Sequence, residues 1–301
     1  MERQDWTGVF SAITTPFRDD LTVDHAFLAR HVAWLVDHGV RGIVPLGSLG
    51  EGATLSPAEK VEVLSTCRKT TAGRVPLVAG IGTLATEDAV TLAREAQRVG
   101  CDGLMVLPPY VYRGDARETL AHLAAVIEAT PLSCMLYNNP IAYGTDVTPA
   151  QLGELAALAN LVAVKESSGD IRRVTEIAER HGKRFNVFVG LDDAIVEGIA
   201  AGAVGWIGGL VNALPDESVR LFDLAMAGRA DEARALYQWF LPLLRLDTVP
   251  KFVQLIKLLQ QEAGQGRERV RPPRLELAGD ERAAALALIR ERLGTIPTPR
   301  A

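Results

Sequence analysis

The chain has little of what would place it in a membrane, in a disulfide-stabilised fold or on a nucleic acid. Its 301 residues include three cysteines that are far apart, which excludes a disulfide frame and indicates a reducing compartment such as the cytoplasm. No apolar run is long enough to cross a bilayer, and the amino terminus lacks a signal-peptide core. The formal net charge of −5 gives no attraction to nucleic acid or anionic lipid. We therefore expect a cytoplasmic globular protein without membrane or nucleic-acid partners.

Signatures of metals and cofactors are scarce as well. The five histidines all fall in expected helices or at their ends, and the cysteines have no ligand-like spacing. Gly80-Ile81-Gly82 is a weak dinucleotide signal, because no third glycine opens the next helix and no acidic residue ends the following strand. We expect neither a metal site nor an external cofactor.

What the chain does contain is an alternation of short apolar runs and longer amphipathic segments. The strand-like runs are 8–14, 42–46, 75–79, 103–107, 133–137, 161–165, 186–189 and 203–207. The helical patterns are 24–38, 57–72, 86–99, 115–129, 148–158, 170–181, 191–201 and 215–228. Eight such units predict an α/β fold, a closed (β/α)8 TIM barrel. A doubly wound open sheet is the alternative, but it normally has fewer units and another glycine fingerprint.

The pattern becomes purely helical after residue 230. Helices are predicted over 231–245, 249–262 and 280–294, with an extended connection over 265–277. We expect a barrel over 1–229 that carries the active site, and a C-terminal helical segment over 230–301 packed on it. Two unrelated domains are the weaker interpretation, because no flexible stretch separates the parts.

Lys165 is the most informative residue. It ends the apolar run 161–165, and the carboxyl ends of barrel strands form the active site. Burial disfavours the charged ammonium form, which makes such a lysine a nucleophile. The structural alternative is a lysine that reaches solvent or pairs with Glu166.

Other strand ends offer groups suited to a small acid. The loop 47–52 presents backbone N–H groups and the Ser48 hydroxyl, which suit a carboxylate, unless it is a plain tight turn. Tyr137 is placed to carry protons, unless it is a core aromatic. Together with Lys165 these groups predict imine formation with a 2-oxo acid. The protonated imine is an electron sink, so no external cofactor is required.

Five motifs follow one another in the order and at the spacing of a known enzyme family. They are residues 8–17 (GVFSAITTPF), 47–51 (GSLGE), 137–140 (YNNP), 164–170 (VKESSGD) and 190–193 (GLDD). Over nearly its whole length the chain resembles the dihydrodipicolinate synthase / N-acetylneuraminate lyase family of class I, Schiff-base aldolases. The resemblance implies a (β/α)8 barrel with a C-terminal helical segment, usually in a homotetramer built as a dimer of dimers.

The resemblance also implies roles for individual residues. Lys165 takes the Schiff-base position and Tyr137 the proton-relay position. Ser48 and the backbone N–H of Leu49 hold the carboxylate of the 2-oxo acid substrate. Gly190 and Ile207 line the site beside the lysine.

The chain departs from the family pattern at three places. In the lysine-biosynthesis enzyme an arginine five positions after the tyrosine binds the second substrate's carboxylate. Here that position is Ala142, and no neighbouring arginine in the sequence replaces it. Leu49 replaces the usual second hydroxyl. The relay tyrosine that a neighbouring subunit lends should fall between Tyr110 and Tyr112, but direct alignment places Val111 there.

These departures favour a catabolic lyase. We expect a Schiff-base lyase acting on a pyruvate-type 2-oxo acid or a cyclic imine equivalent. The segments 137–143 and 247–251 incline us towards 1-pyrroline-4-hydroxy-2-carboxylate deaminase, or a related keto-deoxy sugar acid dehydratase or aldolase. The alternatives are 4-hydroxy-tetrahydrodipicolinate (dihydrodipicolinate) synthase, with another cation doing the arginine's work, and a barrel that binds a keto acid without turning it over. A flavin or phosphate barrel is disfavoured, because no basic residue accompanies the glycines after the last two strands.

Overall fold

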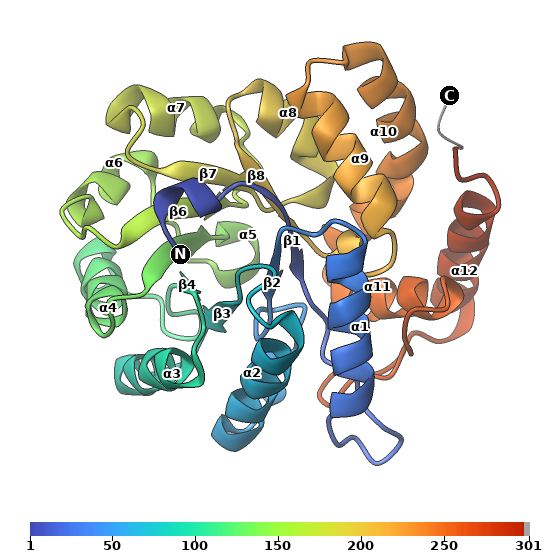
Figure 1. Cartoon of the computed structure of the whole chain (residues 1–301), viewed down its shortest axis with the longest axis horizontal. Helices are drawn as coiled ribbons and strands as arrows, with labels where there is room; N and C mark the ends of the chain where they lie inside the picture. Colours follow the sequence, from blue (N-terminus) through green and yellow to red (C-terminus); the bar gives the residue numbers. More distant parts are fainter. Residues whose placement is uncertain (298–301) are drawn as a thin grey trace.

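Eight parallel strands form a closed barrel at the centre of the chain (Figure 1). The computed structural model describes residues 1–297. The strands are β1 (Gly8–Ala12), β2 (Gly42–Val44), β3 (Val78–Ile81), β4 (Gly103–Val106), β5 (Ser133–Asn138), β6 (Leu161–Glu166), β7 (Asn186–Val189) and β8 (Gly205–Gly208). They pair in the order β2-β1-β8-β7-β6-β5-β4-β3, and a bridge between Ile43 and Leu77 joins β2 to β3. The predicted (β/α)8 barrel is confirmed.

Helices follow the strands and cover the outside of the barrel (Figure 1). They are α1 (His25–Asp37), α2 (Pro57–Thr71), α3 (Thr86–Val99), α4 (Ala116–Glu128), α6 (Pro149–Leu152), α7 (Arg172–His181), α8 (Ile195–Ala200) and α9 (Pro215–Met226). A further four-residue helix, α5 (Pro140–Tyr143), follows β5 directly and was not predicted. None of the helices among residues 1–297 combines the length and apolar character needed to cross a membrane.

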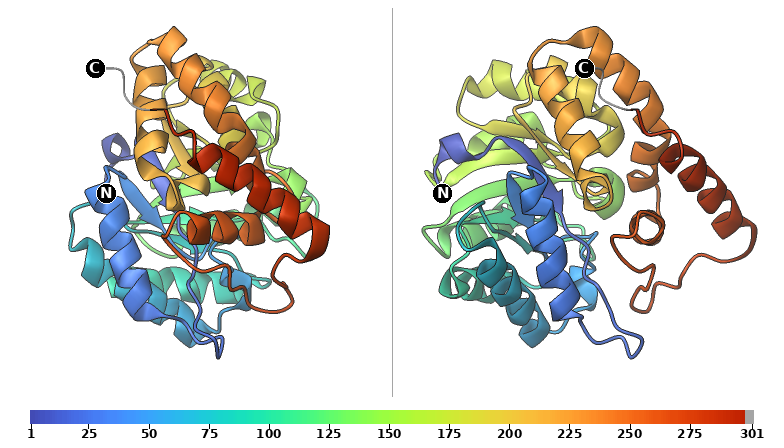
Figure 2. Two further views of the ribbon diagram at one scale, coloured as in Figure 1. Left: turned by 90° about the vertical axis from the view of Figure 1, so that its right-hand side faces the viewer. Right: turned by 45° about the vertical axis from the view of Figure 1, so that its right-hand side comes forward.

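Three helices follow the barrel, as the sequence predicts. They are α10 (Ala230–Leu244), α11 (Phe252–Glu262) and α12 (Gly279–Leu293), and α12 lies outermost (Figure 2). The predicted connection over 265–277 contains neither helix nor strand. Residues 298–301 of the predicted C-terminal segment lie outside the described residues.

Capping residues account for several helix starts. The Ser56 hydroxyl accepts a hydrogen bond from the Glu59 N–H at the start of α2, and the Thr148 hydroxyl caps α6 in the same way. Each cap is followed by a proline, whose missing N–H is no loss in the first turn. Such caps are typically worth about 1 kcal/mol.

One predicted strand and two predicted helices differ from the structure. The third strand begins at Val78 rather than at residue 75, because Pro76 has no N–H to donate to a ladder. The helix predicted over 148–158 ends early and continues as the 3₁₀ turn Gly153–Leu155, since glycine weakens a helix.

The helix predicted over 191–201 begins as the 3₁₀ turn Asp192–Ala194 and becomes α-helical at Ile195. The side chain of Asp192 accepts hydrogen bonds from backbone N–H groups after β8, which holds this turn against the barrel. In the C-terminal segment, a 3₁₀ turn, η6 (Arg245–Asp247), separates α10 from α11.

Aromatic side chains fill part of the barrel interior. The rings of Phe10 and Phe188 lie 5.3 Å apart, and Trp6 contacts both. A Cβ on Gly205 would lie 2.2 Å from the Phe188 ring, so only glycine leaves room there. The Trp6 indole donates to the Ser133 hydroxyl at 2.7 Å, at the amino end of β5. This packing leaves the polar groups of the interior at the other end of the strands.

Candidate active site

Lys165 lies on β6, in register with Tyr137 on β5 and Phe188 on β7. Its side chain is 5% exposed, and Nζ lies 4.2 Å from the centre of the Tyr137 ring. Within residues 1–297 this amine forms no ion pair. Lys165 and Tyr137, the two residues expected to carry out the chemistry, therefore lie side by side inside the barrel.

The structural alternative for Lys165 does not hold. Successive residues of a strand face opposite sides, so Glu166 points away from Lys165. The Glu166 carboxylate accepts hydrogen bonds from the Asn138 amide at 3.2 Å and from the Ser168 N–H at 2.6 Å. Lys165 neither reaches solvent nor pairs with Glu166.

Gly190 lies directly against the lysine. A Cβ at this position would be 2.7 Å from Lys165 Cε and 2.0 Å from the Ser167 hydroxyl oxygen. Because atoms cannot approach so closely, any side chain at Gly190 would displace the lysine. The Ser167 hydroxyl is buried and has no hydrogen-bond partner among the described residues.

Three tyrosines and a serine form a hydroxyl cluster at the mouth of the site. Tyr143 and Ser48 share a hydrogen bond. The Tyr143 ring packs edge-on against Tyr137, with centres 5.8 Å apart, and lies 5.9 Å from the ring of Tyr110. Burial raises the pKa of Tyr143 well above its usual range, and the neighbouring Tyr137 adds to the effect.

The sequence analysis did not assign Tyr143 to the site. It lies on α5, where the Asn139 side chain accepts from the Ala142 N–H and Pro140 occupies the first turn. The Asn139 amide also donates to the Tyr137 hydroxyl at 2.9 Å. An asparagine followed by proline is a helix-start signal, and it could have predicted α5.

The remaining predicted substrate-binding residues are buried at the same end of the barrel. Leu49 follows β2, and Ile207 lies within β8. Leu49 reaches the backbone of Gly209, where a Cβ would lie 2.9 Å from Leu49 Cδ2. The loop after β2 therefore meets the end of β8, although β1 lies between these two strands in the barrel.

Tyr110 and Tyr112 take different positions. Tyr110 is partly buried beside Tyr143, whereas Tyr112 is 64% exposed and donates to Glu118. Val111 is 71% exposed. Tyr112 therefore does not enter the site of its own chain, and its role in a neighbouring site stays a prediction.

An arginine that the sequence did not reveal lies near Ala142. The guanidinium of Arg113 packs against Gly144, where a Cβ would be 2.5 Å from Cζ. Arg113 belongs to the loop after β4, some 30 positions earlier in the chain, so no local sequence signal relates it to Ala142. The expectation concerned the sequence neighbours of Ala142, and this contact with Gly144 does not test it.

A buried carboxyl group was also missed. Asp192 is fully buried, and its Oδ1 accepts from the Trp206 indole at 2.9 Å. Its Oδ2 accepts from the N–H groups of Gly209 at 3.1 Å and Leu210 at 2.8 Å. Burial raises its pKa to about 6, although these donors and Lys165 oppose the shift.

A second carboxyl group, that of Asp247, comes from η6 in the C-terminal segment. A Cβ on Gly209 would lie 2.2 Å from its Oδ1. Burial raises the pKa of Asp247 well above its usual range, the nearby charge of Asp192 adds to the effect, and Lys165 opposes it. The charge of Lys165 therefore acts on two acids from different parts of the chain, Asp192 and Asp247.

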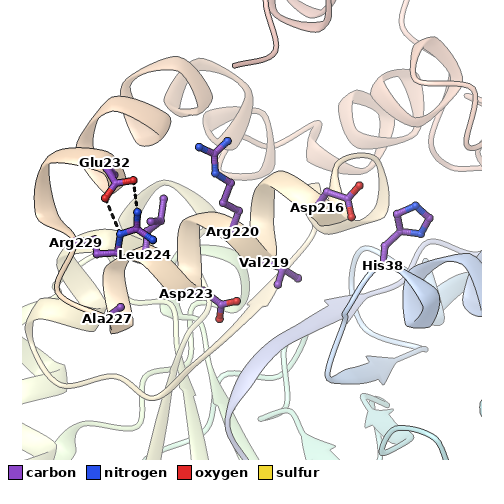
Figure 3. Close-up of a pocket in the computed structure, with 9 residues that line it drawn as sticks. All are labelled: His38, Asp216, Val219, Arg220, Asp223, Leu224, Ala227, Arg229 and Glu232. Atoms are coloured by element: carbon purple, nitrogen blue, oxygen red, sulfur yellow. Dashed lines mark hydrogen bonds and ion pairs between the residues drawn. The ribbon is translucent and has the colours of Figure 1, made fainter. Parts of the chain in front are cut away.

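A groove of about 540 Å³ on the outside of the barrel is separate from this site (Figure 3). It lies along α9, next to His38 at the end of α1, and the pair Arg229–Glu232 crosses one end. None of the predicted site residues lines it. Residues 1–297 also contain no cluster of three side chains suited to hold a metal ion.

A buried lysine beside a tyrosine, at the carboxyl ends of eight parallel strands, defines a lyase of the class I, Schiff-base type. The comparison with protein families narrows this class. Residues 5–292 match the model of the dihydrodipicolinate synthetase family, and the chain belongs to that family.

Named relatives cover almost the whole chain. The 4-hydroxy-tetrahydrodipicolinate synthase of Methanothrix thermoacetophila is 35% identical, over 93% of this chain and 94% of the relative. That of Pelobacter propionicus is 32% identical, over 96% and 99%. The dihydrodipicolinate synthase structure from Aquifex aeolicus is 28% identical, with a TM-score of 0.91 over 95% of this chain and 98% of that one.

A dihydrodipicolinate synthase from Acinetobacter baumannii, solved in complex with pyruvate, is 27% identical. Its TM-score is 0.89 over 95% of this chain and 98% of that one. The family and the lyase class predicted from the sequence are confirmed. The names of the relatives agree with the synthase alternative rather than with the deaminase that we placed first.

Proposed function

We propose that the chain eliminates water from one small hydroxylated 2-oxo acid, or water and ammonia from its cyclic imine, through a Schiff base on Lys165. The specific candidate is 1-pyrroline-4-hydroxy-2-carboxylate deaminase; a keto-deoxy sugar acid dehydratase or aldolase shares its first steps. One observation carries this proposal. Ala142 stands where a synthase needs an arginine, and the group of α5 that reaches Ser48 is the uncharged hydroxyl of Tyr143.

In this proposal Lys165 adds to C2 of the substrate. The Ser48 hydroxyl and the Leu49 N–H hold the C1 carboxylate, while Gly190 and Ile207 leave room beside the lysine. The resulting iminium draws electrons from C3, whose proton passes to Tyr137. The support for these roles is the packing of Lys165 Nζ on the Tyr137 ring and its lack of an ion pair within residues 1–297.

With the cyclic imine, attack by Lys165 at C2 transfers the imine to the lysine and frees the ring nitrogen as an amine on C5. Loss of the C3 proton and the C4 hydroxyl releases water. The new double bond shifts towards C5, and hydrolysis there releases ammonia. Hydrolysis of the lysine imine then gives 2-oxoglutarate semialdehyde. One water is consumed overall, so the atoms balance.

A second candidate is 4-hydroxy-tetrahydrodipicolinate synthase. The names of relatives at 32–35% identity favour it. Arg113 supplies a cation against Gly144, two residues from Ala142, and is the group that would bind the carboxylate of a second substrate. In that case two substrates are joined, and the enamine on Lys165 attacks an aldehyde.

Borohydride reduction in the presence of pyruvate tests the shared first step. We expect an adduct on Lys165, identified by intact mass and peptide mapping, and no adduct in Lys165→Ala. If folded wild-type protein forms no adduct with pyruvate or with 1-pyrroline-4-hydroxy-2-carboxylate, the Schiff-base mechanism is wrong.

A substrate comparison separates the two candidates. We expect turnover of 1-pyrroline-4-hydroxy-2-carboxylate alone, with release of ammonia, and little condensation of pyruvate with aspartate semialdehyde. Condensation of pyruvate with aspartate semialdehyde without turnover of 1-pyrroline-4-hydroxy-2-carboxylate, with the condensation lost in Arg113→Ala, would establish the synthase. An adduct without any turnover, unaffected by Tyr137→Phe, would instead support a barrel that only binds the acid.

We further propose that the chain works in the cytoplasm as a homotetramer of two dimers. Three buried free thiols, Cys67, Cys101 and Cys134, support a reducing compartment. Exposed apolar side chains at Leu84, Val111 and Ile141, each in a segment that follows a barrel strand, support cover by another copy. Mass measurement in solution, repeated with Val111→Asp, tests the assembly.

A further inference from the structure

One acid near Lys165 has an oxygen atom without a partner. Oδ1 of Asp247 is buried and makes no hydrogen bond within residues 1–297. A buried polar atom without a partner is costly, and native proteins keep one mainly where it has a function. Asp192, by contrast, accepts three hydrogen bonds and is fixed as an acceptor.

The free oxygen lies against Gly209, directly after β8. A Cβ on Gly209 would lie 2.2 Å from Oδ1 of Asp247 and 2.9 Å from Cδ2 of Leu49. These two atoms therefore lie close to each other. Leu49 belongs to the loop that we assign to the substrate carboxylate. A second buried oxygen without a partner, that of the Ser167 hydroxyl, lies against Gly190 beside the lysine. Two unpartnered polar groups thus lie near Lys165.

We propose that Asp247 is a catalytic acid that protonates the leaving hydroxyl group of the substrate. The inference rests on the proposed elimination and adds to it a residue from outside the barrel. The C3–H electron pair forms the new C3=C4 bond through the enamine, and the C4–O bond breaks. The departing oxygen takes the proton of the Asp247 carboxyl group and leaves as water. Asp247 remains as a carboxylate and regains a proton from solvent after product release.

The charges around Asp247 suit an acid that keeps its proton until it is needed. Asp192 and Asp193 face it from the turn after β7, and both disfavour a further negative charge. Lys165 and the backbone N–H of Gly209 oppose this effect on the pKa of Asp247. Arg245, on the same turn as Asp247, lies 3.9 Å from Asp193. Once Lys165 is bound in the imine, its charge still stabilises the carboxylate that the proton transfer leaves behind.

The test uses two leaving groups in the full-length enzyme. The probes are 1-pyrroline-4-hydroxy-2-carboxylate and its 4-O-acetyl ester, whose acetate leaves without a proton. We expect Asp247→Asn to lower kcat for the hydroxyl compound about 10²-fold, the usual worth of a general acid. The ester should react nearly as in the wild type, and the borohydride adduct with pyruvate should be unchanged. Asp223→Asn, which removes an exposed acid of the outer groove along α9, is the matched control and should affect neither probe.

Equal losses with both probes would make Asp247 structural and overturn the proposal, as would wild-type rates in Asp247→Asn. Loss of the pyruvate adduct would also overturn it, because the residue would then act on Lys165 and not on the leaving group. If wild-type protein forms no adduct at all, the proposed function itself has failed. Should Asp247→Asn not fold, the wild-type pH profiles decide: the fall in rate at high pH must be present with the hydroxyl compound and absent with the ester.

Discussion

The chain contains two buried lysines, and their surroundings differ in one respect that decides what each can do. Lys165 is 5% exposed and Lys257 is 1% exposed. Each lies over an aromatic ring, Tyr137 at 4.2 Å and Phe17 at 4.4 Å. Lys257, on α11, also donates to the Glu51 carboxylate at 2.5 Å and to the carbonyl oxygens of Thr15 and Arg269, both at 2.8 Å. Lys165 has no such acceptors within residues 1–297.

Burial alone therefore does not make a lysine reactive. Three acceptors occupy the three N–H bonds of Lys257, so its amine is held as a structural cation. It ties the loop after β2 to the C-terminal segment, and Glu51 adopts a left-handed backbone conformation, with φ of 52°, to reach it. Lys165 keeps its amine free for a ligand. The partners of a buried lysine, more than its depth, separate the structural role from the chemical one.

The largest expected effect comes from removing the free lysine. Lys165→Ala should lower kcat/KM by more than about 10³-fold and abolish borohydride trapping, because no other group supplies the electron sink. Circular dichroism checks that the variant is folded. Lys257→Met should still be trapped; if Lys257 rather than Lys165 carries the reduced adduct, the comparison is wrong.

Removing Lys257 should lower the free energy of unfolding rather than the activity. Lys257→Met removes the closest cation from the buried Glu51 carboxylate and leaves it the Arg271 N–H at 3.0 Å and the Arg274 guanidinium at 3.9 Å. Breaking a buried ion pair in this way typically costs about 3–5 kcal/mol, and these remaining partners place the expected loss at the lower end. Urea denaturation measures the loss. The double variant Lys257→Met, Glu51→Met should recover most of it, since both charges are then absent. Equal stability of the single variant and the wild type would show that the pair is unimportant.

A smaller effect is expected at the hydroxyl cluster. Tyr143→Phe removes the hydrogen bond to Ser48 and should lower kcat by about 10-fold to 10²-fold, while trapping on Lys165 persists. Tyr112→Phe is the informative control. If Tyr112→Phe leaves the activity unchanged, all residues of the proton relay belong to one chain. A comparable loss would mean that the exposed Tyr112 serves the site of a neighbouring subunit.

The smallest effect concerns pH. Burial lowers the pKa of Lys257 to about 8, and Glu51 opposes the shift. Between pH 8 and the ordinary lysine value of about 10.4, the unfolded chain binds more protons at this residue than the folded chain does, so its contribution to stability rises with pH. The difference in unfolding free energy between wild type and Lys257→Met, followed from pH 8 to 10, should change in that direction. A constant difference would contradict the shift.

The barrel and the central pair of the site were predictable from the sequence. Buried parallel strands are apolar along their whole length, so a lysine at the end of one stands out, and strand ends must meet at one face of a barrel. Tyr137 and Gly190 were found by the same argument. The boundaries were less predictable where proline or glycine interrupted an apolar run, as at Pro76 and Gly153.

Tyr143 and Asp247 fall in the segments 137–143 and 247–251, on which the deaminase prediction rests, but neither residue was assigned a role; Arg113 was not singled out at all. Tyr143 lies on a four-residue helix, which is too short for a periodic pattern. Arg113 and Asp247 reach the site from segments far away in sequence, and nothing local relates them to Lys165. Contacts of this kind depend on how loops and added helices fold back over the barrel, which side-chain periodicity does not encode.

The junction between β2 and β3, which closes the barrel, is where we expect local opening of the sheet to begin. A single bridge, between Ile43 and Leu77, joins the two strands, and its bonds include the one from Ile43 N–H to the Pro76 carbonyl; a further bond runs from Gly80 N–H to the Pro45 carbonyl. Other neighbouring strands share longer ladders, so local opening at the seam breaks the fewest bonds. Amide hydrogens there should exchange fastest among the strands. The loop that carries Ser48 begins directly after this seam, so we expect local opening of the seam to displace the substrate-binding loop with it.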